Sequence, residues 1–176
     1  MLKTIIRMLS LCLLTTACTG QPRASQLPYV QSPAYDSTLQ KLLSFNVPVI
    51  GVKELQKIKD EVFIFDTRKP EEFAQSHIEG ARFLGYAPPH WEAVEDIPKK
   101  SPIIVYCSVG YRSEAVGKML EDRGFSDVRN LYGGLFSWVN QGLPVVDTLG
   151  QSTQTVHTYD AEWSRWLTAP DIRKVW

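Results

Sequence analysis

Two short runs of continuous hydrophobic residues constrain the fold of this chain most strongly. Val62–Phe65 is ended by Asp66, and Ile103–Tyr106 leads directly into a polar loop. Continuous rather than alternating hydrophobicity is typical of strands that are buried on both faces of a parallel sheet. A helix-like segment follows each run, and the first of these helices is opened by Pro70. We therefore predict an α/β fold, a parallel sheet with helices on both faces.

The remaining segments extend this alternation through a domain that we place at residues 47–147. The expected strands are Val49–Ile50, Ala81–Leu84 and Val128–Leu131, and the expected helices are Val52–Ile58, Ser113–Arg123 and Leu135–Gln141. After Asp147 the pattern changes, and we assign residues 148–176 to a short C-terminal extension that packs on the domain. Within it we expect a helix over Asp160–Leu167 whose Trp163 and Trp166 pack on the domain rather than form a binding surface.

Residues 1–17 have the composition of an export signal. Lys3 and Arg7 form a short basic n-region, and the apolar stretch Met8–Leu14 is too short to be a permanent membrane span. The sequence before Cys18 resembles the lipobox of bacterial lipoproteins, although Thr15 stands where that motif prefers a branched aliphatic residue. The resemblance implies a lipidated Cys18, with the protein exported and anchored to a membrane, facing the periplasm or the outer cell surface. An ordinary signal peptide cut nearby is the alternative. Residues 18–46 are then predicted to be a lipid-anchored flexible linker that ends in a short helix around Ser37–Leu43.

Cys107 is the cysteine that remains if the signal is removed and Cys18 is lipidated, so it has no intramolecular disulfide partner. It ends a predicted buried strand and precedes a glycine-bearing loop and a helix. Backbone N–H groups and the positive end of a helix therefore surround its sulfur. Such surroundings lower the pKa of a thiol and favour an anion directly above it. The pattern indicates a cysteine that attacks a small anionic substrate.

The length of the loop separates two kinds of cysteine chemistry. Four residues lie between Cys107 and Arg112. Cysteine phosphatases use a loop one residue longer, which forms a ring that fits a tetrahedral phosphate. The smaller ring here favours a smaller group, such as a sulfane sulfur carried as a persulfide. A thiol reductase would need a resolving cysteine, which the mature chain does not offer.

Four motifs occur in an order that resembles a single-domain rhodanese, a sulfurtransferase family. They are Asp66-Thr67-Arg68, His77-Ile78-x-Gly80-Ala81, the loop from Tyr106 to Ser113, and Gly133-Gly134-x-x-x-Trp138, and the match covers about Val47 to Val146. The resemblance implies a rhodanese-like domain in which Cys107 carries sulfur as a persulfide. The donor would be thiosulfate or a persulfide, and the acceptor a thiol, cyanide or sulfite. The alternative is a non-catalytic module that carries persulfide sulfur or binds a partner at the membrane.

The same resemblance assigns roles to individual residues. The substrate-cradling loop comprises Ser108, Val109, Gly110, Tyr111, Arg112 and Ser113. Arg112 is expected to contact an anionic substrate, and Ser113 to cap the helix, to donate to the thiolate, or both. Supporting residues are Asp66 and Arg68 as an ion pair, His77 in a structural role, and Gly133 and Gly134 in a tight turn beside the site.

Charge and histidine spacing limit the remaining functions. Nineteen basic and nineteen acidic residues balance, and no basic stripe suggests nucleic-acid binding. His90 and His157 lack metal-ligand spacing, so we expect neither a metal nor another cofactor. Ser108 stands where many rhodanese loops have a basic residue, which leaves Arg112 as the loop's cation. We therefore expect thiosulfate, a dianion, to be a poor donor.

Overall fold

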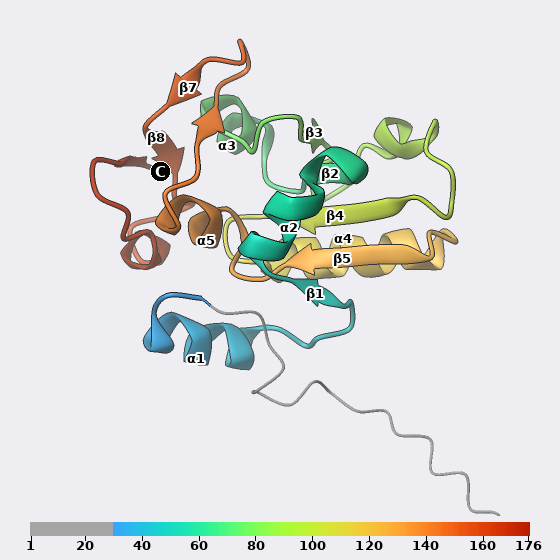
Figure 1. The fold of residues 1–176 in the computed structure, drawn as a ribbon, viewed down its shortest axis with the longest axis horizontal. Coiled ribbons are helices and arrows are strands. Elements are labelled where there is room, and N and C mark those ends of the chain that lie inside the picture. The colour runs from blue at the N-terminus through green and yellow to red at the C-terminus, as the bar shows by residue number, and fades with distance from the viewer. Residues whose placement is uncertain (1–29) are drawn as a thin grey trace, which may run out of the picture.

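The computed structural model describes residues 30–176. Its centre is a five-stranded parallel sheet with the strand order β1-β5-β4-β2-β3 (Figure 1). The strands are β1 (Val49–Ile50), β2 (Phe63–Asp66), β3 (Arg82–Phe83), β4 (Pro102–Tyr106) and β5 (Asp127–Leu131). All four pairings in this sheet are parallel. The predicted α/β fold is therefore confirmed.

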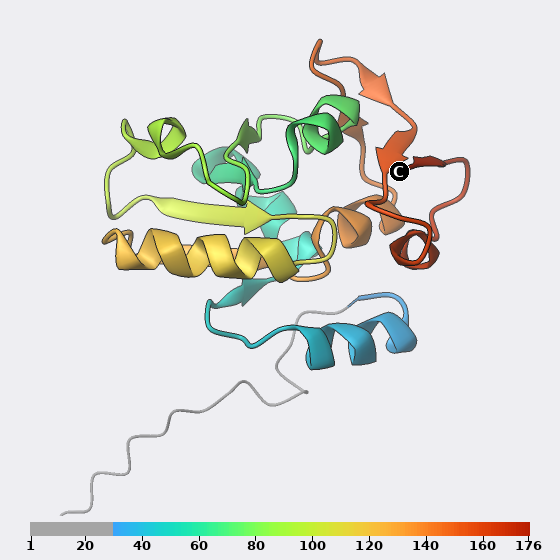
Figure 2. The same ribbon diagram turned by 180° about the vertical axis from the view of Figure 1, so that it is seen from behind.

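The helices divide between the two faces of the sheet (Figures 1 and 2). They are α2 (Val52–Ile58), α3 (Pro70–Gln75), α4 (Tyr111–Asp122) and α5 (Gly134–Asn140), with short 3-10 turns at Lys59–Glu61 and Trp91–Val94. Alternate residues of β4 point to opposite faces, as the pleat requires. Ile104 and Tyr106 join the core cluster that includes α2 and α5, whereas Ile103 and Val105 join the cluster that includes α4. Burial on both faces explains the continuous hydrophobic runs.

Strand register brings two loops together at the carboxyl edge of the sheet. Asp66 at the end of β2 lies opposite Tyr106 at the end of β4. The amide of Thr67 then donates a hydrogen bond of 2.9 Å to the Tyr106 carbonyl. The segment before α3 and the segment after Cys107 consequently start side by side. This edge is where open parallel sheets usually form their ligand sites.

A short helix was predicted around Ser37–Leu43 and is present, but the prediction that residues 30–46 form a flexible linker is wrong because this segment is docked on the domain. Helix α1 spans Pro33–Leu42, with Ser32 as its N-cap and with Tyr35 and Leu39 buried in the core cluster. The Glu114 carboxylate of α4 then accepts hydrogen bonds of 2.9 Å from the amides of Ser44 and Asn46. Helix α1 buries only Tyr35 and Leu39, one helical turn apart in an otherwise polar segment. The hydrogen bonds to Glu114 then fix the chain that follows the helix and help to hold it on the domain.

The C-terminal extension packs against the domain and against α1. Its elements are β7 (Ser152–Thr153), which pairs with β6 (Val145–Val146) at the end of the domain, β8 (Thr155–His157), a 3-10 turn at Trp163–Trp166, and β9 (Arg173–Val175). Val156 and Leu167 are fully buried, and the rings of Trp166 and Tyr35 stack at 5.3 Å. The helix predicted over Asp160–Leu167 is only this 3-10 turn. The Asn140 side chain accepts from the next amides, those of Thr168 and Ala169, and so holds the chain after the turn in a non-helical path.

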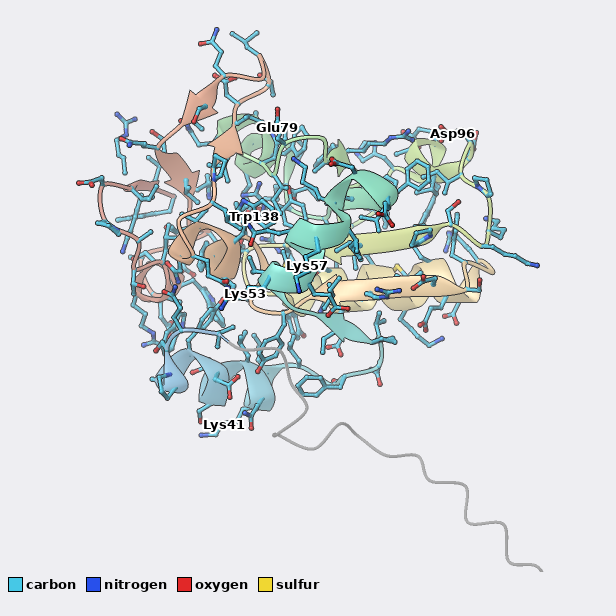
Figure 3. The ribbon with its side chains drawn as sticks, in the orientation of Figure 1. Lys41, Lys53, Lys57, Glu79, Asp96 and Trp138 are labelled. Atoms are coloured by element: carbon cyan, nitrogen blue, oxygen red, sulfur yellow. The ribbon has the colours of Figure 1, made fainter. Side chains whose placement is uncertain are left out.

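The predicted signal peptide and Cys18 lie outside the described residues. Within residues 30–176, no helix is both long and apolar enough to cross a membrane. Lys41 on α1 and Lys53 and Lys57 on α2 are exposed and lie on the outer surface of these helices (Figure 3). Their polar faces oppose the buried ones, as expected for helices that cover a core.

Candidate active site

Cys107 lies at the end of β4 at the floor of a cavity. Its residue surface is 1% exposed, and it is the free cysteine of residues 30–176. The chain turns at Gly110, whose φ of +110° is unfavourable for residues with a Cβ. The Gly110 amide donates a hydrogen bond of 3.1 Å to the Cys107 sulfur. Gly110 is also the N-cap of α4, so the helix begins at Tyr111 rather than at Ser113 as predicted. Ser113 therefore lies within the first turn, and its predicted role as the helix cap is wrong.

The surroundings of Cys107 favour its thiolate. Burial alone would raise the pKa of the thiol. The Arg112 guanidinium and the backbone N–H groups of Ser113 and Val109 act in the opposite direction, and together they hold the pKa below the ordinary value. The thiolate is the nucleophilic form of cysteine, so the loop supplies an activated sulfur.

Helix α5 fixes the orientation of the loop from behind. The amides of Leu135 and Phe136 donate to the carbonyls of Cys107 and Ser108, at 2.8 and 3.1 Å. With these carbonyls directed at α5, the loop N–H groups are free to face the sulfur. This approach requires glycine at position 134, where φ is +54° and a Cβ would lie 2.3 Å from the Cys107 carbonyl oxygen.

A buried carboxylate holds Arg112. Glu72 accepts two short hydrogen bonds from the Arg112 guanidinium, 2.6 Å to Oε2 and 2.8 Å to Oε1. The Ser108 hydroxyl also donates to Glu72, at 3.3 Å. Burial raises the pKa of Glu72, but the contacts with Arg112 outweigh this effect, and the pKa is lowered overall. Arg112 is thus neither an exposed helix-start arginine nor an unpaired cation above Cys107. It is held in a charge-assisted pair that orients it.

Two further cations reach the cavity, and each also has a carboxylate partner. Arg68 lies fully buried with its Nη2 at 2.6 Å from the Asp66 carboxylate. Lys69 lies at the rim, with its Nζ at 3.9 Å from Glu71. Arg68, Lys69 and Arg112 all line the cavity. The charge of Arg68 is therefore compensated by the buried Asp66, in the ion pair that the sequence predicted, whereas Lys69 makes only a long contact with Glu71 between exposed side chains. Of these three cations, Lys69 is the one that the sequence pattern did not indicate.

The remaining supporting residues lie behind the cavity wall. Ser113 donates 2.7 Å to the side chain of Asn130, which in turn donates 2.9 Å to the Gly110 carbonyl and so braces the loop. His77 stacks on Phe73 at 4.0 Å, and its Nδ1 lies 3.1 Å from the Phe73 carbonyl oxygen. His77 is absent from the cavity lining. Its contacts are those of a structural residue.

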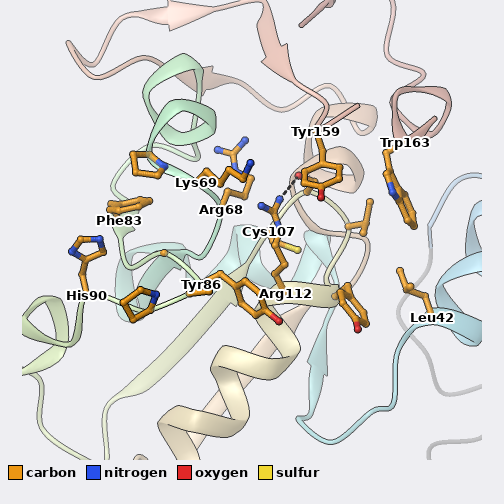
Figure 4. A pocket seen from close by; sticks show the side chains of 17 residues that line it. Leu42, Arg68, Lys69, Phe83, Tyr86, His90, Cys107, Arg112, Tyr159 and Trp163 are labelled. Carbon is orange, nitrogen blue, oxygen red and sulfur yellow. Dashed lines mark hydrogen bonds between the residues drawn. The ribbon is translucent and has the colours of Figure 1, made fainter. Parts of the chain in front are cut away.

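The cavity in front of Cys107 has a volume of about 730 Å³, within the usual range for small-molecule sites. It is lined by Leu42, Arg68, Lys69, Pro70, Phe83, Gly85, Tyr86, Ala87, Pro88, His90, Cys107, Ser108, Val109, Tyr111, Arg112, Tyr159 and Trp163. Figure 4 shows Phe83 and His90 on one side, Tyr159, Trp163 and Leu42 on the other, and Cys107 with Arg112 between them. Trp163 packs against the core of the domain, as predicted, and its side chain also forms part of the cavity wall.

Comparison with known proteins agrees with this geometry. The family model described as rhodanese-like domain matches residues 51–141. A sulfurtransferase of Allochromatium vinosum is 36% identical over 89 residues, which cover 49% of this chain and 80% of that protein. The thiosulfate sulfurtransferase GlpE of Coxiella burnetii is 35% identical over 85 residues, 48% of this chain and 78% of that protein.

A solved structure supports the fold. The solution structure of a rhodanese-like domain from an Anabaena protein superimposes with a TM-score of 0.54 at 24% identity. The superposition covers 60% of this chain and 83% of that domain. The family match spans β2 to β5, the Cys107 loop and α5, and it leaves α1, β1 and the C-terminal extension outside. On these matches, the chain belongs to the rhodanese-like family.

Proposed function

We propose that the protein is a sulfurtransferase that moves a sulfane sulfur from a donor to a thiophilic acceptor through a Cys107 persulfide. The observation that carries this proposal is the buried Cys107 sulfur, which faces a cavity, receives the Gly110 amide at 3.1 Å and has a lowered pKa. The similarity to sulfurtransferases of two bacteria supports the same reaction class.

The reaction divides into two displacements at sulfur. The Cys107 thiolate attacks the outer sulfur of the donor, the donor's S–S bond breaks, and its electron pair leaves with the remainder, which is sulfite when the donor is thiosulfate. The loop N–H groups then face the Cys107 persulfide anion. An acceptor such as cyanide, sulfite or a thiolate attacks the outer sulfur and releases the Cys107 thiolate. Arg112 lies close enough to favour the negative charge at each stage.

The pH dependence of thiocyanate formation tests this proposal. Because the pKa of Cys107 is lowered, kcat/KM for the donor should rise with pH and level off below the usual thiol pKa of about 8.5. Arg112→Gln removes the neighbouring cation and should move the midpoint upward by roughly one unit. His77→Gln, a change outside the cavity, should leave the midpoint in place. An unchanged midpoint in Arg112→Gln would contradict the assigned source of activation.

The Glu72–Arg112 pair should make thiosulfate a poor donor, because Glu72 neutralises the cation nearest to Cys107. Glu72→Gln should lower KM for thiosulfate several-fold, and the gain should shrink as salt rises. Glu54→Gln is the matched control, since it makes the same change in net charge at an exposed position of α2 outside the cavity lining. Steady-state kinetics across ionic strength compare the two. Equal responses would show that general charge, rather than the buried pair, sets the affinity for thiosulfate.

We further propose that the protein is exported and anchored to a membrane through a lipidated Cys18, facing the periplasm or the outer cell surface. The basic, apolar and small-residue segments that precede Cys18 support this proposal. In cells, Cys18→Ala should block processing or release the protein from the membrane fraction, because the acyl chains supply the anchor. Labelling with palmitate measures lipidation, and cell fractionation measures release from the membrane. An unlabelled, soluble wild-type protein would remove the anchor and leave the sulfurtransferase proposal untouched.

A further inference from the structure

Tyr159, from the C-terminal extension, closes one side of the Cys107 site. Its ring centroid lies 5.2 Å from the guanidinium carbon of Arg112 and 5.9 Å from the ammonium of Lys69. Both cations line the cavity, and Tyr159 itself is 48% exposed. The ring therefore covers charged groups with an aromatic face. A substrate that approaches Cys107 meets this ring beside Arg112 (Figure 4).

The backbone at Tyr159 is held in a strained conformation. Its φ is +71°, a left-handed conformation that is unusual for a residue with a Cβ. The residues on either side fix this conformation. The fully buried Thr158 donates its amide to Val175 at 2.8 Å, and the Asp160 amide donates to the Thr158 carbonyl at 2.9 Å. The Tyr159 amide itself donates to the His157 ring at 3.1 Å. These hydrogen bonds hold the backbone on both sides of Tyr159 and so fix where its ring lies.

Trp163 and Leu42 continue the wall that Tyr159 begins. Trp163 belongs to the same extension, and Leu42 is the last residue of α1. All three lie outside residues 51–141, the part that matches the family. Phe83 and Tyr86 line the cavity from the domain itself. Segments on both sides of the domain therefore give the cavity a largely aromatic and aliphatic lining around one reactive sulfur.

The size and charge of the cavity point to an organic substrate. Since one water molecule takes up about 30 Å³ of liquid, thiosulfate would fill only a small part of the 730 Å³. Arg68 and Arg112 are already paired with buried carboxylates, which weakens their attraction for a dianion. We propose that Tyr159, with Trp163 and Leu42, selects donors whose sulfane sulfur is carried by an apolar organic group. This inference rests on the proposed sulfurtransferase function and specifies its donor class.

Thiosulfonates provide matched probes of this selectivity. The Cys107 thiolate attacks the outer sulfur of benzenethiosulfonate, the bond to the sulfonyl sulfur breaks, and the electron pair leaves on benzenesulfinate. Cyanide then removes the outer sulfur as thiocyanate. Methanethiosulfonate carries the same single charge and releases the same kind of leaving group, but it lacks the ring. The ratio of kcat/KM for the two donors, divided by their ratio of rates with a free thiol in solution, isolates recognition of the organic group.

Wild-type protein should prefer benzenethiosulfonate by about tenfold or more in this corrected ratio. Tyr159→Asn removes the ring and keeps a residue type that tolerates left-handed backbone, so it should reduce the preference several-fold, mainly through KM. Trp163→Ala removes a second aromatic ring from the same wall and should also reduce the preference for benzenethiosulfonate. Tyr159→Phe should keep the preference. Leu149→Asn, at an exposed position of the same extension, is the matched control.

The outcomes separate the two proposals. Equal corrected rates with both donors would overturn the donor class while leaving sulfur transfer intact, as would a preference that persists in both Tyr159→Asn and Trp163→Ala. A loss that affects both donors equally in both variants would also contradict selectivity by this wall. Thiocyanate formation from none of the donors would overturn the proposed function, and this inference with it.

Discussion

Cys107→Ser should abolish sulfur transfer, lowering kcat/KM by about a thousandfold or more, while leaving the fold intact. A serine hydroxyl cannot form the persulfide, yet it has nearly the volume of the thiol and can accept the hydrogen bond that Gly110 now donates to Sγ. The side chain is buried beneath the cavity rather than among core aliphatics. We therefore expect the free energy of unfolding to change by no more than about 1 kcal/mol. Thiocyanate formation and calorimetry measure the two quantities.

This comparison also separates an enzyme from a passive module. Appreciable activity in Cys107→Ser would contradict the covalent mechanism. If the wild-type protein accepts sulfur on Cys107 but does not turn over with small acceptors, the chain is a persulfide carrier, the alternative that the sequence leaves open. Hydrolysis of an aryl phosphate well above background would contradict the argument from loop length.

Gly134→Ala should disrupt both the fold and the site. The new Cβ would meet three backbone atoms, the Cys107 carbonyl oxygen at 2.3 Å and the carbonyl carbon and oxygen of Ser108, both at 2.7 Å. Backbone atoms that are already hydrogen-bonded to α5 cannot move away without breaking those bonds. We expect a loss of about 3 kcal/mol or more in the free energy of unfolding. Activity should also fall, because the N–H groups around Sγ depend on that packing.

Gly142→Ala is the matched control for this variant. Gly142 has a similarly positive φ of +77°, but a Cβ there would meet nothing within 4 Å. Gly142→Ala should lower the free energy of unfolding only by the backbone strain, about 1–2 kcal/mol, and should leave kcat unchanged. Denaturant unfolding and steady-state kinetics of both variants test this account. Equal losses would show that backbone conformation alone, rather than the approach of α5 to the Cys107 loop, makes glycine necessary.

The central sheet was predictable because the hydrophobicity pattern of each strand reflects whether one or both of its faces are buried. A strand buried on both faces needs an uninterrupted apolar run, and β2 and β4 show one each. The Cys107 loop was equally visible, since a cysteine, a glycine and a helix start within a few residues define its backbone. These are local signals, and they predicted local structure.

The pairing of Arg112 with Glu72 could not be predicted in the same way. The two residues are 40 positions apart, and Glu72 suited the first turn of α3 without any reference to Arg112. Only the register of β2 with β4 brings them together. The same holds for Tyr159, whose place above Arg112 depends on how β8 and β9 pair and pack. Long-range contacts of this kind decide the charge and shape of the cavity, whereas the sequence motif decides its chemistry.

The central claim is that Cys107 receives a sulfur atom from the donor. Intact-protein mass spectrometry after brief exposure to thiosulfate, methanethiosulfonate or benzenethiosulfonate, followed by peptide mapping, tests it most directly. We predict a mass increase of one sulfur atom, located on Cys107, removed by cyanide and absent from Cys107→Ser. An unchanged mass with every donor, or a sulfur atom located on another residue, would contradict the claim.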